Sequence, residues 1–190
     1  MTDAALRTEK LTKHYGDVEA LNDLDLEVAM GEVFGFLGPN GAGKTTMMDI
    51  LVGYLIPDAG RASVAGIDVL ERPLDVQARI GYLPENNPLY EDMNVREYLD
   101  FIGRARRLDG ATLKRRIEWV VEAAGIAKVY HKPINELSKG YKQRTGLAQA
   151  LIHDPDILIL DEPTNGLDPL QIMGIRDLIK SLAGHKTIIF

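Results

Sequence analysis

Residues 38–45 combine the residue types that bind the phosphates of a nucleotide. They are, in order, Gly38, Pro39, Asn40, Gly41, Ala42, Gly43, Lys44 and Thr45. Together they fill every fixed position of the pattern G-x-x-x-x-G-K-[ST]. Glycines let the backbone curl so that successive N–H groups point inward at an anion. Lys44 adds a positive charge for the β- and γ-phosphates, and the Thr45 hydroxyl is a hard oxygen ligand for Mg²⁺.

The setting of this loop favours the same interpretation. It lies between an apolar run, residues 33–37, and a helix expected over residues 44–52, whose positive dipole end adds to the anion site. We also expect Thr46, in the first turn of that helix, to contact the nucleotide. The loop predicts a nucleoside triphosphate with Mg²⁺, and by itself it leaves open a kinase, a GTPase or a motor protein.

Two carboxylates follow an apolar run later in the chain. Residues 157–160 read Ile-Leu-Ile-Leu, and Asp161 and Glu162 come directly after them. In open α/β sheets ligands lie at the carboxyl ends of the strands, so both acids should face the phosphate loop. We expect Asp161 to hold the Mg²⁺ shell and Glu162 to polarise an attacking water as general base.

Two further segments narrow the choice of protein class. Residues 137–144 read L-S-K-G-Y-K-Q-R and resemble a signature usually written L-S-G-G-Q, and residues 165–168 read N-G-L-D. Taken alone, Ser138 is only a good N-cap before a helix. Its position ahead of the acidic strand, by which we mean the apolar run 157–160 with Asp161 and Glu162 directly after it, favours a functional role for Ser138. Over nearly its whole length the chain resembles ABC nucleotide-binding domains, and exporter-type (ABC-2-like) subunits among them.

The resemblance implies an ATPase that works as a pair of chains. Two copies pair head to tail, and each ATP lies between the phosphate loop of one chain and Ser138, Gly140 and Asp168 of the other. Tyr15 stands where the family has the aromatic residue that stacks on adenine. The implied partners are a second ABC ATPase domain and separate transmembrane permease subunits, which place this chain in the cytoplasm at the inner face of the cell membrane.

The chain departs from the family pattern in two motifs. Lys139 and Tyr141 replace the second glycine and the glutamine of the usual signature, and this variant suggests an exporter subclass. Glu85 stands where the family has a glutamine. We expect Glu85 to join Thr45 and Asp161 as a metal-site residue, and an ordinary solvated loop acid is the alternative.

The histidine that senses the γ-phosphate in this family follows the strand expected at residues 187–190. His185 precedes that strand and is expected to be a surface turn residue. His14, His131 and His153 also lack the right setting. We therefore expect a domain truncated at its C-terminus that binds ATP and hydrolyses it slowly.

Hydrophobic periodicity predicts the elements that position these residues. Strands are expected at residues 6–11, 21–28, 33–37, 63–64, 80–83, 157–160 and 187–190. Helices are expected at residues 44–52, 94–106, 113–124, 138–153 and 169–183. Asn94 and Glu97 are expected to form a capping box, and Gly125 is expected to be a left-handed cap after the helix at 113–124.

This order of elements predicts one α/β domain. It has a P-loop core with a mostly parallel sheet, an N-terminal antiparallel β part and an inserted helical subdomain. Residues 1–87 and 153–190 belong to the core with the β part, and residues 88–152 form the helical subdomain that includes the signature.

Composition excludes several classes of protein. The formal net charge of −6 argues against a general nucleic-acid binder, and the absence of cysteine excludes disulfides and cysteine-ligated zinc. No apolar run approaches the roughly 18 residues that span a bilayer, so any membrane role requires a partner. No nucleic-acid partner is expected.

The leading hypothesis is a subunit that couples ATP-driven dimerisation to transport, with export as the direction. The alternative is a soluble ABC ATPase that acts on ribosomes or DNA, and a P-loop kinase ranks below both. Apolar residues of the helical subdomain are either its core or a docking surface for the permease: Leu89, Tyr90, Tyr98, Phe101 and Ile102. A basic stretch, residues 104–116, is read as a solvated helix face, with a surface for anionic lipid as the alternative.

Overall fold

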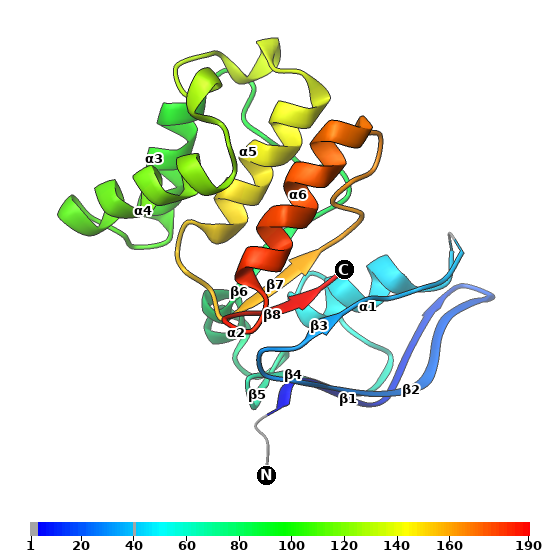
Figure 1. Ribbon diagram of the computed structural model, residues 1–190. Coiled ribbons are helices and arrows are strands. Elements are labelled where there is room, and N and C mark those ends of the chain that lie inside the picture. The colour runs from blue at the N-terminus through cyan, green and yellow to red at the C-terminus, as the bar shows by residue number, and fades with distance from the viewer. Residues whose placement is uncertain (1–3, 40) are drawn as a thin grey trace.

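The computed structural model describes residues 4–39 and 41–190, whose strands form two sheets (Figure 1). The N-terminal sheet contains β1 (Ala4–Tyr15), β2 (Val18–Ala29), β4 (Ala59–Val64) and β5 (Ile67–Asp68), in the order β2-β1-β4-β5. All its neighbours are antiparallel. The antiparallel β part is therefore confirmed, with strands longer than periodicity alone predicts.

The second sheet is parallel and carries the buried centre of the molecule. It contains β3 (Val33–Phe34), β6 (Ile80–Leu83), β7 (Ile157–Leu160) and β8 (Thr187–Ile189), in the order β3-β8-β7-β6. Strand β7 is fully buried, and its side chains alternate between two hydrophobic clusters. Ile157 and Ile159 pack in the cluster that includes α1, and Leu158 and Leu160 in the cluster that includes α5 and α6.

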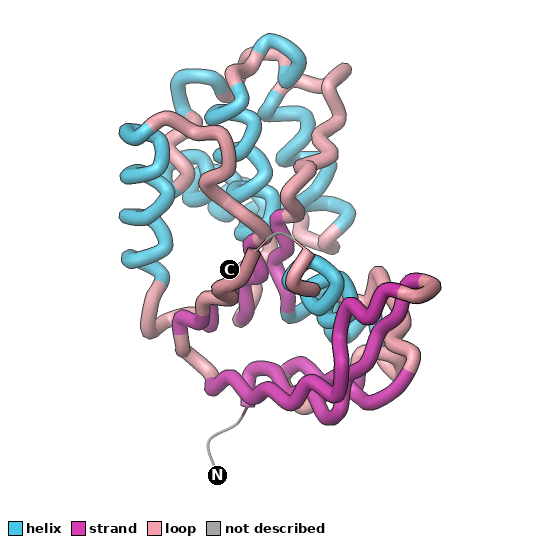
Figure 2. Tube along the Cα trace, turned by 90° about the vertical axis from the view of Figure 1, so that its right-hand side faces the viewer, coloured by secondary structure: helices cyan, strands magenta, loops and turns pink. Residues whose placement is uncertain are grey.

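Helices lie on both faces of the parallel sheet. They are α1 (Lys44–Leu51), α2 (Pro73–Arg79), α3 (Val95–Ala105), α4 (Gly110–Ala123), α5 (Lys139–Leu151) and α6 (Pro169–Leu182), with 3₁₀ turns η1 (Ala127–Val129) and η2 (Ile134–Glu136). Figure 2 shows the antiparallel strands as a separate layer below, while most helices lie on the other side of the parallel strands. Helix α1 lies between the two sheets. Its first turn lies near the carboxyl ends of the parallel strands.

The predicted helix boundaries follow from capping. Asn94 accepts from the backbone N–H of Glu97 at 2.9 Å, and the Glu97 carboxylate accepts from the backbone N–H of Asn94 at 3.1 Å, which completes the capping box of α3. Gly125, with φ of +65°, follows α4 in the left-handed conformation. Ser138 is the N-cap of α5. All three predictions are confirmed.

One expectation from local pattern was wrong, and one helix was missed. The apolar run 33–37 was expected to be a buried strand, yet Val33 is 41% exposed and Leu37 is 98% exposed. Strand β3 is an edge strand, and the chain leaves it after Phe34 to enter the phosphate loop. Helix α2 was not expected. It starts at Pro73, whose fixed φ suits the first helical position.

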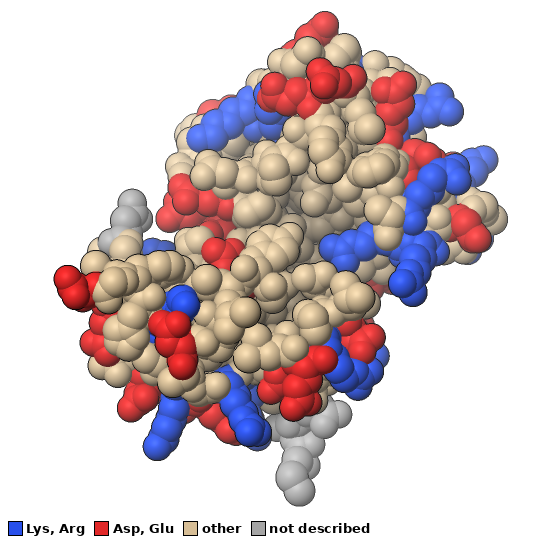
Figure 3. Space-filling model, turned by 180° about the vertical axis from the view of Figure 1, so that it is seen from behind, with Lys and Arg blue, Asp and Glu red and all other residues tan. Residues whose placement is uncertain are grey.

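The surface separates charged from uncharged areas on the face seen from behind. Figure 3 shows uncharged residues in the middle of this face, with acidic and basic side chains around them. Among the helices that the structure describes, none combines the length and the apolar character needed to cross a membrane.

Candidate functional site

The N-terminus of α1 is shaped by glycine. Gly43 precedes the helix with φ of +80°, and a Cβ atom here would collide with the carbonyl oxygen of Ala20 in β2. Glycine is therefore required both by the backbone conformation and by the close approach of another strand. Within the described part of the chain, no side chain caps this helix start, so its first N–H groups face the loop that precedes them.

The Lys44 side chain lies over the loop. Its ammonium group donates to the carbonyl oxygens of Gly38 at 2.6 Å and Pro39 at 3.1 Å. This folds the loop around the lysine and places a positive charge beside the first turn of α1. Asn40, predicted to bind nucleotide, lies outside the described residues.

A cavity of about 390 Å³ opens beside this helix start. Its walls are formed by Tyr15, Val18, Ala20, Gly41, Ala42, Gly43, Lys44, Thr45, Thr46, Glu85 and Glu162. Most of the predicted site residues are thus brought together in one place, although they are far apart in the sequence. Val18 and Ala20 were not predicted. The only sequence signal for them is their position just after Tyr15 in the same hairpin.

Thr45, which lines the cavity, is hydrogen-bonded to Asp161. The Thr45 hydroxyl donates to the Asp161 carboxylate at 2.8 Å, and Asp161 is only 2% exposed. The backbone N–H of Asp161 donates to the carbonyl of Leu83, so the turn after β7 is fixed to the end of β6. A buried carboxylate next to a hydroxyl is an oxygen donor set that suits Mg²⁺.

The rest of the cavity is consistent with that ion. In residues 4–39 and 41–190 no group of three or more His, Cys, Asp or Glu side chains is placed to hold a metal by itself. Mg²⁺ commonly takes one or two protein ligands and completes its shell with water and substrate phosphates. Thr45 and Asp161 therefore fit Mg²⁺ that arrives with a triphosphate.

Glu162 adopts an unusual backbone conformation. Its φ is +46°, in the left-handed region that residues other than glycine rarely occupy. Its side chain is partly buried and lines the cavity. Strained backbone of this kind persists where the surroundings enforce it, and it is concentrated at functional sites. Sequence alone does not predict this strain.

Glu85 also lines the cavity, from the loop that follows β6. Its carboxylate accepts from the side-chain amide of Asn165 at 3.3 Å. This bond connects the loop after β6 with the loop after β7. Glu85 is exposed, so its expected role as a metal ligand stays a prediction.

Tyr15 projects from the tip of the β1–β2 hairpin. Its ring is 51% exposed and lines the cavity beside Val18, which is 63% exposed. The Lys13 ammonium lies 5.9 Å from the ring centroid. An accessible aromatic face at the mouth of a phosphate site is suited to stacking on a base.

The match to known families agrees with this geometry. The model of a family described as ABC transporter matches residues 21–165, which include the phosphate loop, the signature and the acidic strand. The chain belongs to the ABC transporter family. It carries the ATP-binding domain of that family, and the ATPase fold predicted from sequence is confirmed.

Individual relatives match over almost the whole chain. The daunorubicin resistance ATP-binding protein DrrA3 of Streptomyces coeruleorubidus is 41% identical over 100% of this chain and 60% of its own length. The Nod factor export ATP-binding protein I of Cupriavidus pinatubonensis is 42% identical over 98% of this chain and 58% of its own length. This chain thus spans about 60% of the length of either relative.

A solved structure shows the same architecture. The cbiO1 protein of Clostridium perfringens, described as part of the ABC transporter complex cbiONQ, superimposes with a TM-score of 0.84 at 30% identity. The match covers 98% of this chain and 78% of that chain.

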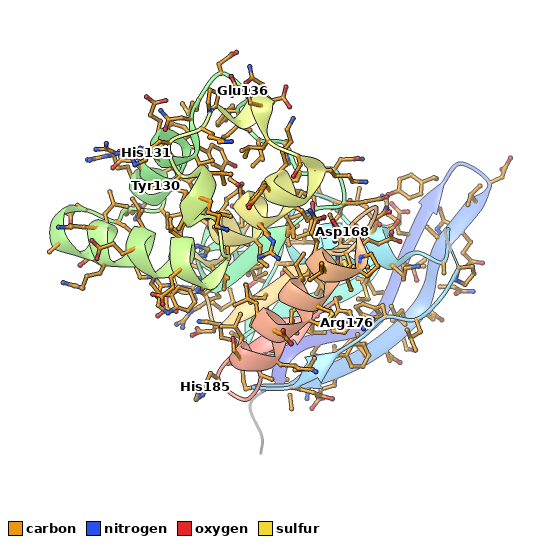
Figure 4. The ribbon with its side chains drawn as sticks, turned by 45° about the horizontal axis from the view of Figure 1, so that its top comes forward. Tyr130, His131, Glu136, Asp168, Arg176 and His185 are labelled. Atoms are coloured by element: carbon orange, nitrogen blue, oxygen red, sulfur yellow. The ribbon has the colours of Figure 1, made fainter. Side chains whose placement is uncertain are left out.

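The ABC signature residues lie apart from the cavity. Ser138 caps α5 by accepting from the backbone N–H of Tyr141 at 3.4 Å, and Gly140 is buried against the side chain of Gln171. Asp168 caps α6 by accepting from the backbone N–H of Gln171 at 3.0 Å (Figure 4). Ser138, Gly140 and Asp168 are not among the cavity residues of their own chain.

The side chain of Lys139, a departure from the usual signature, lies next to the loop before α6. Its side chain lies against Gly166, which has φ of +68° in the loop before α6, so closely that a Cβ atom there would collide with it. The lysine therefore connects the start of the signature helix to the loop that follows the acidic strand.

Among the residues that the structure describes, no histidine lines the cavity. His185 is exposed in the turn before β8, and Figure 4 shows it at the far end of α6 from Asp168. This confirms the expectation of a surface turn residue. His153 is partly buried beside β6, where its Nε2 lies 3.1 Å from the carbonyl oxygen of Ile80. Burial, aided by nearby cations of which Arg106 is foremost, lowers the pKa of His153 to about 4.

A larger groove of about 1110 Å³ lies between α3 and α4. Charges of both signs surround it, among them Arg104 paired with Asp100 and Lys114 paired with Glu118. It has neither the loop amides nor the hydroxyl–carboxylate pair of the smaller cavity, so it is not the nucleotide site.

The basic stretch at residues 104–116 is mostly exposed, as expected for a solvated helix face, but two of its arginines are engaged with the protein itself. Arg116 donates to the carbonyls of Leu151 and Ile152, and Arg106 donates to the carbonyl of Gln77. These contacts favour a structural role for part of the stretch over a lipid-binding surface.

Proposed function

We propose that the chain binds MgATP in the cavity at the start of α1 and hydrolyses it to drive transport. The observation that carries the proposal is the meeting of Thr45 with Asp161 beside Lys44, with Glu162 in the same cavity. A kinase would not need the signature and the loop at residues 165–168, and the family match includes the whole signature.

Each group has a role that its chemistry supports. Lys44 and the N–H groups at the start of α1 bind the phosphates, while Tyr15 stacks on the base. Thr45 and Asp161 would hold Mg²⁺, with Glu85 beside them, and the ion would neutralise charge on the phosphate oxygens. Glu162 accepts a proton from the attacking water, and its enforced backbone conformation supports a fixed direction for the carboxylate.

A second copy of the chain would complete the site. Ser138, Gly140 and Asp168 lie at the starts of α5 and α6 and do not line their own cavity, which supports contact with ATP held by a partner. The N-terminus of α5 favours an anion through its dipole. ATP bound between two chains would hold them together, and hydrolysis would release them.

Transmembrane permease subunits are the proposed partners on the membrane side. Of the apolar residues considered for docking, Tyr98 is 1% exposed and belongs to the core, whereas Tyr90 is 54% and Phe101 is 42% exposed. The Tyr90 and Phe101 rings pack with centroids 5.5 Å apart. An exposed aromatic pair next to the loop that carries Glu85 supports a docking surface there. We propose a cytoplasmic, peripheral location at the inner face of the cell membrane.

Export is the proposed direction of transport. The relatives with about 40% identity include a Nod factor export protein and a daunorubicin resistance protein. The signature variant with Lys139 and Tyr141 points the same way. We further propose that residues 88–152 form a helical subdomain attached to the core at 1–87 and 153–190; α3, α4 and α5 pack together in a hydrophobic cluster that continues into β7 and α6 of the core. We also propose that this chain turns over slowly; the cavity residues that the structure describes include no histidine, which supports the proposal.

Glu162→Gln tests the proposed chemistry. The variant keeps the shape of the side chain and loses the base, so the hydrolysis rate should fall by about a hundredfold or more. MgATP affinity should be retained, and light scattering should show an ATP-dependent dimer. An unchanged rate would exclude Glu162 as the base, and a strictly monomeric variant would contradict the two-chain site.

A further inference from the structure

A second side-chain hydrogen bond joins α1 to the parallel sheet below the proposed metal site. Asp49 lies four residues after Thr45, one turn along the same face of α1. The Tyr82 hydroxyl, on β6, donates to the Asp49 carboxylate at 3.1 Å. The Thr45 hydroxyl donates to Asp161 at 2.8 Å, so the helix makes two such bonds to the sheet, one turn apart.

Both bonds are made on one face of the sheet. Tyr82 of β6 lies opposite Ile159 of β7, and Asp161 comes two residues after Ile159. Residues two apart along an extended strand project to the same side. Tyr82 and Asp161 are therefore neighbouring anchor points for the same helix.

The lower bond lies in a sheltered environment. Asp49 and Tyr82 are both partly buried, and the Tyr54 ring packs edge-on against Tyr82 with centroids 5.8 Å apart. Burial, with a smaller contribution from the charge of Asp161, raises the pKa of Asp49. Burial, followed by the charge of Asp49, likewise raises the pKa of Tyr82. Sheltered hydrogen bonds hold their partners more firmly than exposed ones.

We propose that Tyr82 and Asp49 are positioning residues for Thr45. The buried apolar face of α1 already packs against the sheet, and the Thr45–Asp161 bond is its polar contact in the first turn. The Tyr82–Asp49 bond, one turn further on, adds a second polar contact that restricts small rotations of the helix and keeps the Thr45 hydroxyl directed at the metal position beside Asp161. This inference rests on the proposed function, because it assigns the pair to Mg²⁺-dependent binding of ATP.

The role predicts a signature that a general loss of stability does not produce. Lys44 and the loop amides bind phosphate with or without the ion, whereas Thr45 acts through the ion. Loss of the Tyr82–Asp49 bond should therefore weaken binding of MgATP and leave binding of ATP in EDTA unchanged.

The experiment measures ATP affinity with Mg²⁺ and with EDTA, by calorimetry, for Tyr82→Phe, Asp49→Ala and Asp49→Asn. Tyr82→Phe and Asp49→Ala should each weaken MgATP binding roughly two- to tenfold, the usual range for one net hydrogen bond. Asp49→Asn keeps an acceptor for the Tyr82 hydroxyl and should bind MgATP like the unmodified protein.

Tyr98→Phe is a matched control. Tyr98 is also a buried tyrosine with a side-chain partner, Gln149, but it belongs to the helical cluster around α3 and α5. Its loss should alter thermal stability without changing the effect of Mg²⁺ on ATP affinity.

Different results would overturn different claims. Equal weakening with and without Mg²⁺ in Tyr82→Phe, or unchanged MgATP affinity, would overturn the positioning role alone. Weakening in Asp49→Asn would also overturn it, in favour of a charge effect. Failure of the unmodified protein to bind MgATP would overturn the proposed function and this inference together.

Discussion

The helices α1 and α5 both begin at a glycine-containing motif, but the two helix starts are built differently. Helix α1 follows Gly43 in the left-handed conformation, with no side-chain cap in the described residues, and its first turn opens on the cavity. Helix α5 is capped by Ser138, and Gly140 in its first turn is covered by Gln171.

The difference separates groups that line an accessible cavity of their own chain from groups that do not line it. At α1 the N–H groups, Lys44 and Thr45 lie together at an accessible cavity. At α5 the Ser138 side chain accepts from the backbone N–H of Tyr141, and the side chain of Gln171 lies against Gly140. Neighbouring elements, as well as the motif itself, therefore decide whether the donors of such a motif face a cavity of their own chain.

Alanine at each glycine should give the largest difference between the two helix starts. Gly43→Ala must force a Cβ into the backbone of Ala20 at a positive φ and should destabilise the fold by at least ~3 kcal/mol. Gly140→Ala meets only the mobile amide end of Gln171 and gains helix propensity, so the change should stay within about 1 kcal/mol. Urea unfolding of both variants measures this, and comparable destabilisation would contradict the comparison.

Acidification should lower the stability of the fold through His153, which follows α5 and lies beside β6. The unfolded chain binds a proton on His153 below pH ~6.5, whereas the folded chain resists it until about pH 4, so stability falls as pH falls through this window. The loss should be on the order of 2–3 kcal/mol. His153→Gln keeps a donor for the Ile80 carbonyl and should show a shallower pH dependence. Identical slopes for the two proteins, from unfolding at several pH values, would remove His153 from this role.

Ser138→Ala should have the smallest effect on stability. Its capping bond is long, so its loss should cost about 0.5–1 kcal/mol. ATP affinity of a single chain should not change, since Ser138 does not line the cavity. Calorimetric ATP binding together with thermal unfolding checks both statements, and reduced affinity in a monomer would show that the two helix starts are not independent.

Local chemistry made much of the fold predictable. The Asn94–Glu97 capping box, Gly125 and Ser138 fix helix ends through residues three or four positions apart, which a sequence displays directly. The phosphate loop is likewise continuous in sequence. The position of Asp161 and Glu162 near the phosphate loop was predictable because parallel strands bring their carboxyl ends to one edge of the sheet.

Contacts between distant segments were not predictable. Gln171 covers Gly140 from another helix, Val18 reaches the cavity from the hairpin, and Tyr82 bonds to Asp49 across two elements. The exposure of Leu37 depends on β3 being an edge strand, which no local pattern reveals. The backbone strain at Glu162 depends in the same way on tertiary packing.

The central claim is that α1 provides an ATP site within one chain, and Lys44→Ala tests it most directly. Titration calorimetry with MgATP on the unmodified protein and the variant, with thermal unfolding as the control, gives the answer. Loss of a charged hydrogen-bonding group should weaken binding roughly tenfold to a hundredfold while the unfolding temperature is retained. Equal MgATP affinity in the two proteins would contradict the account.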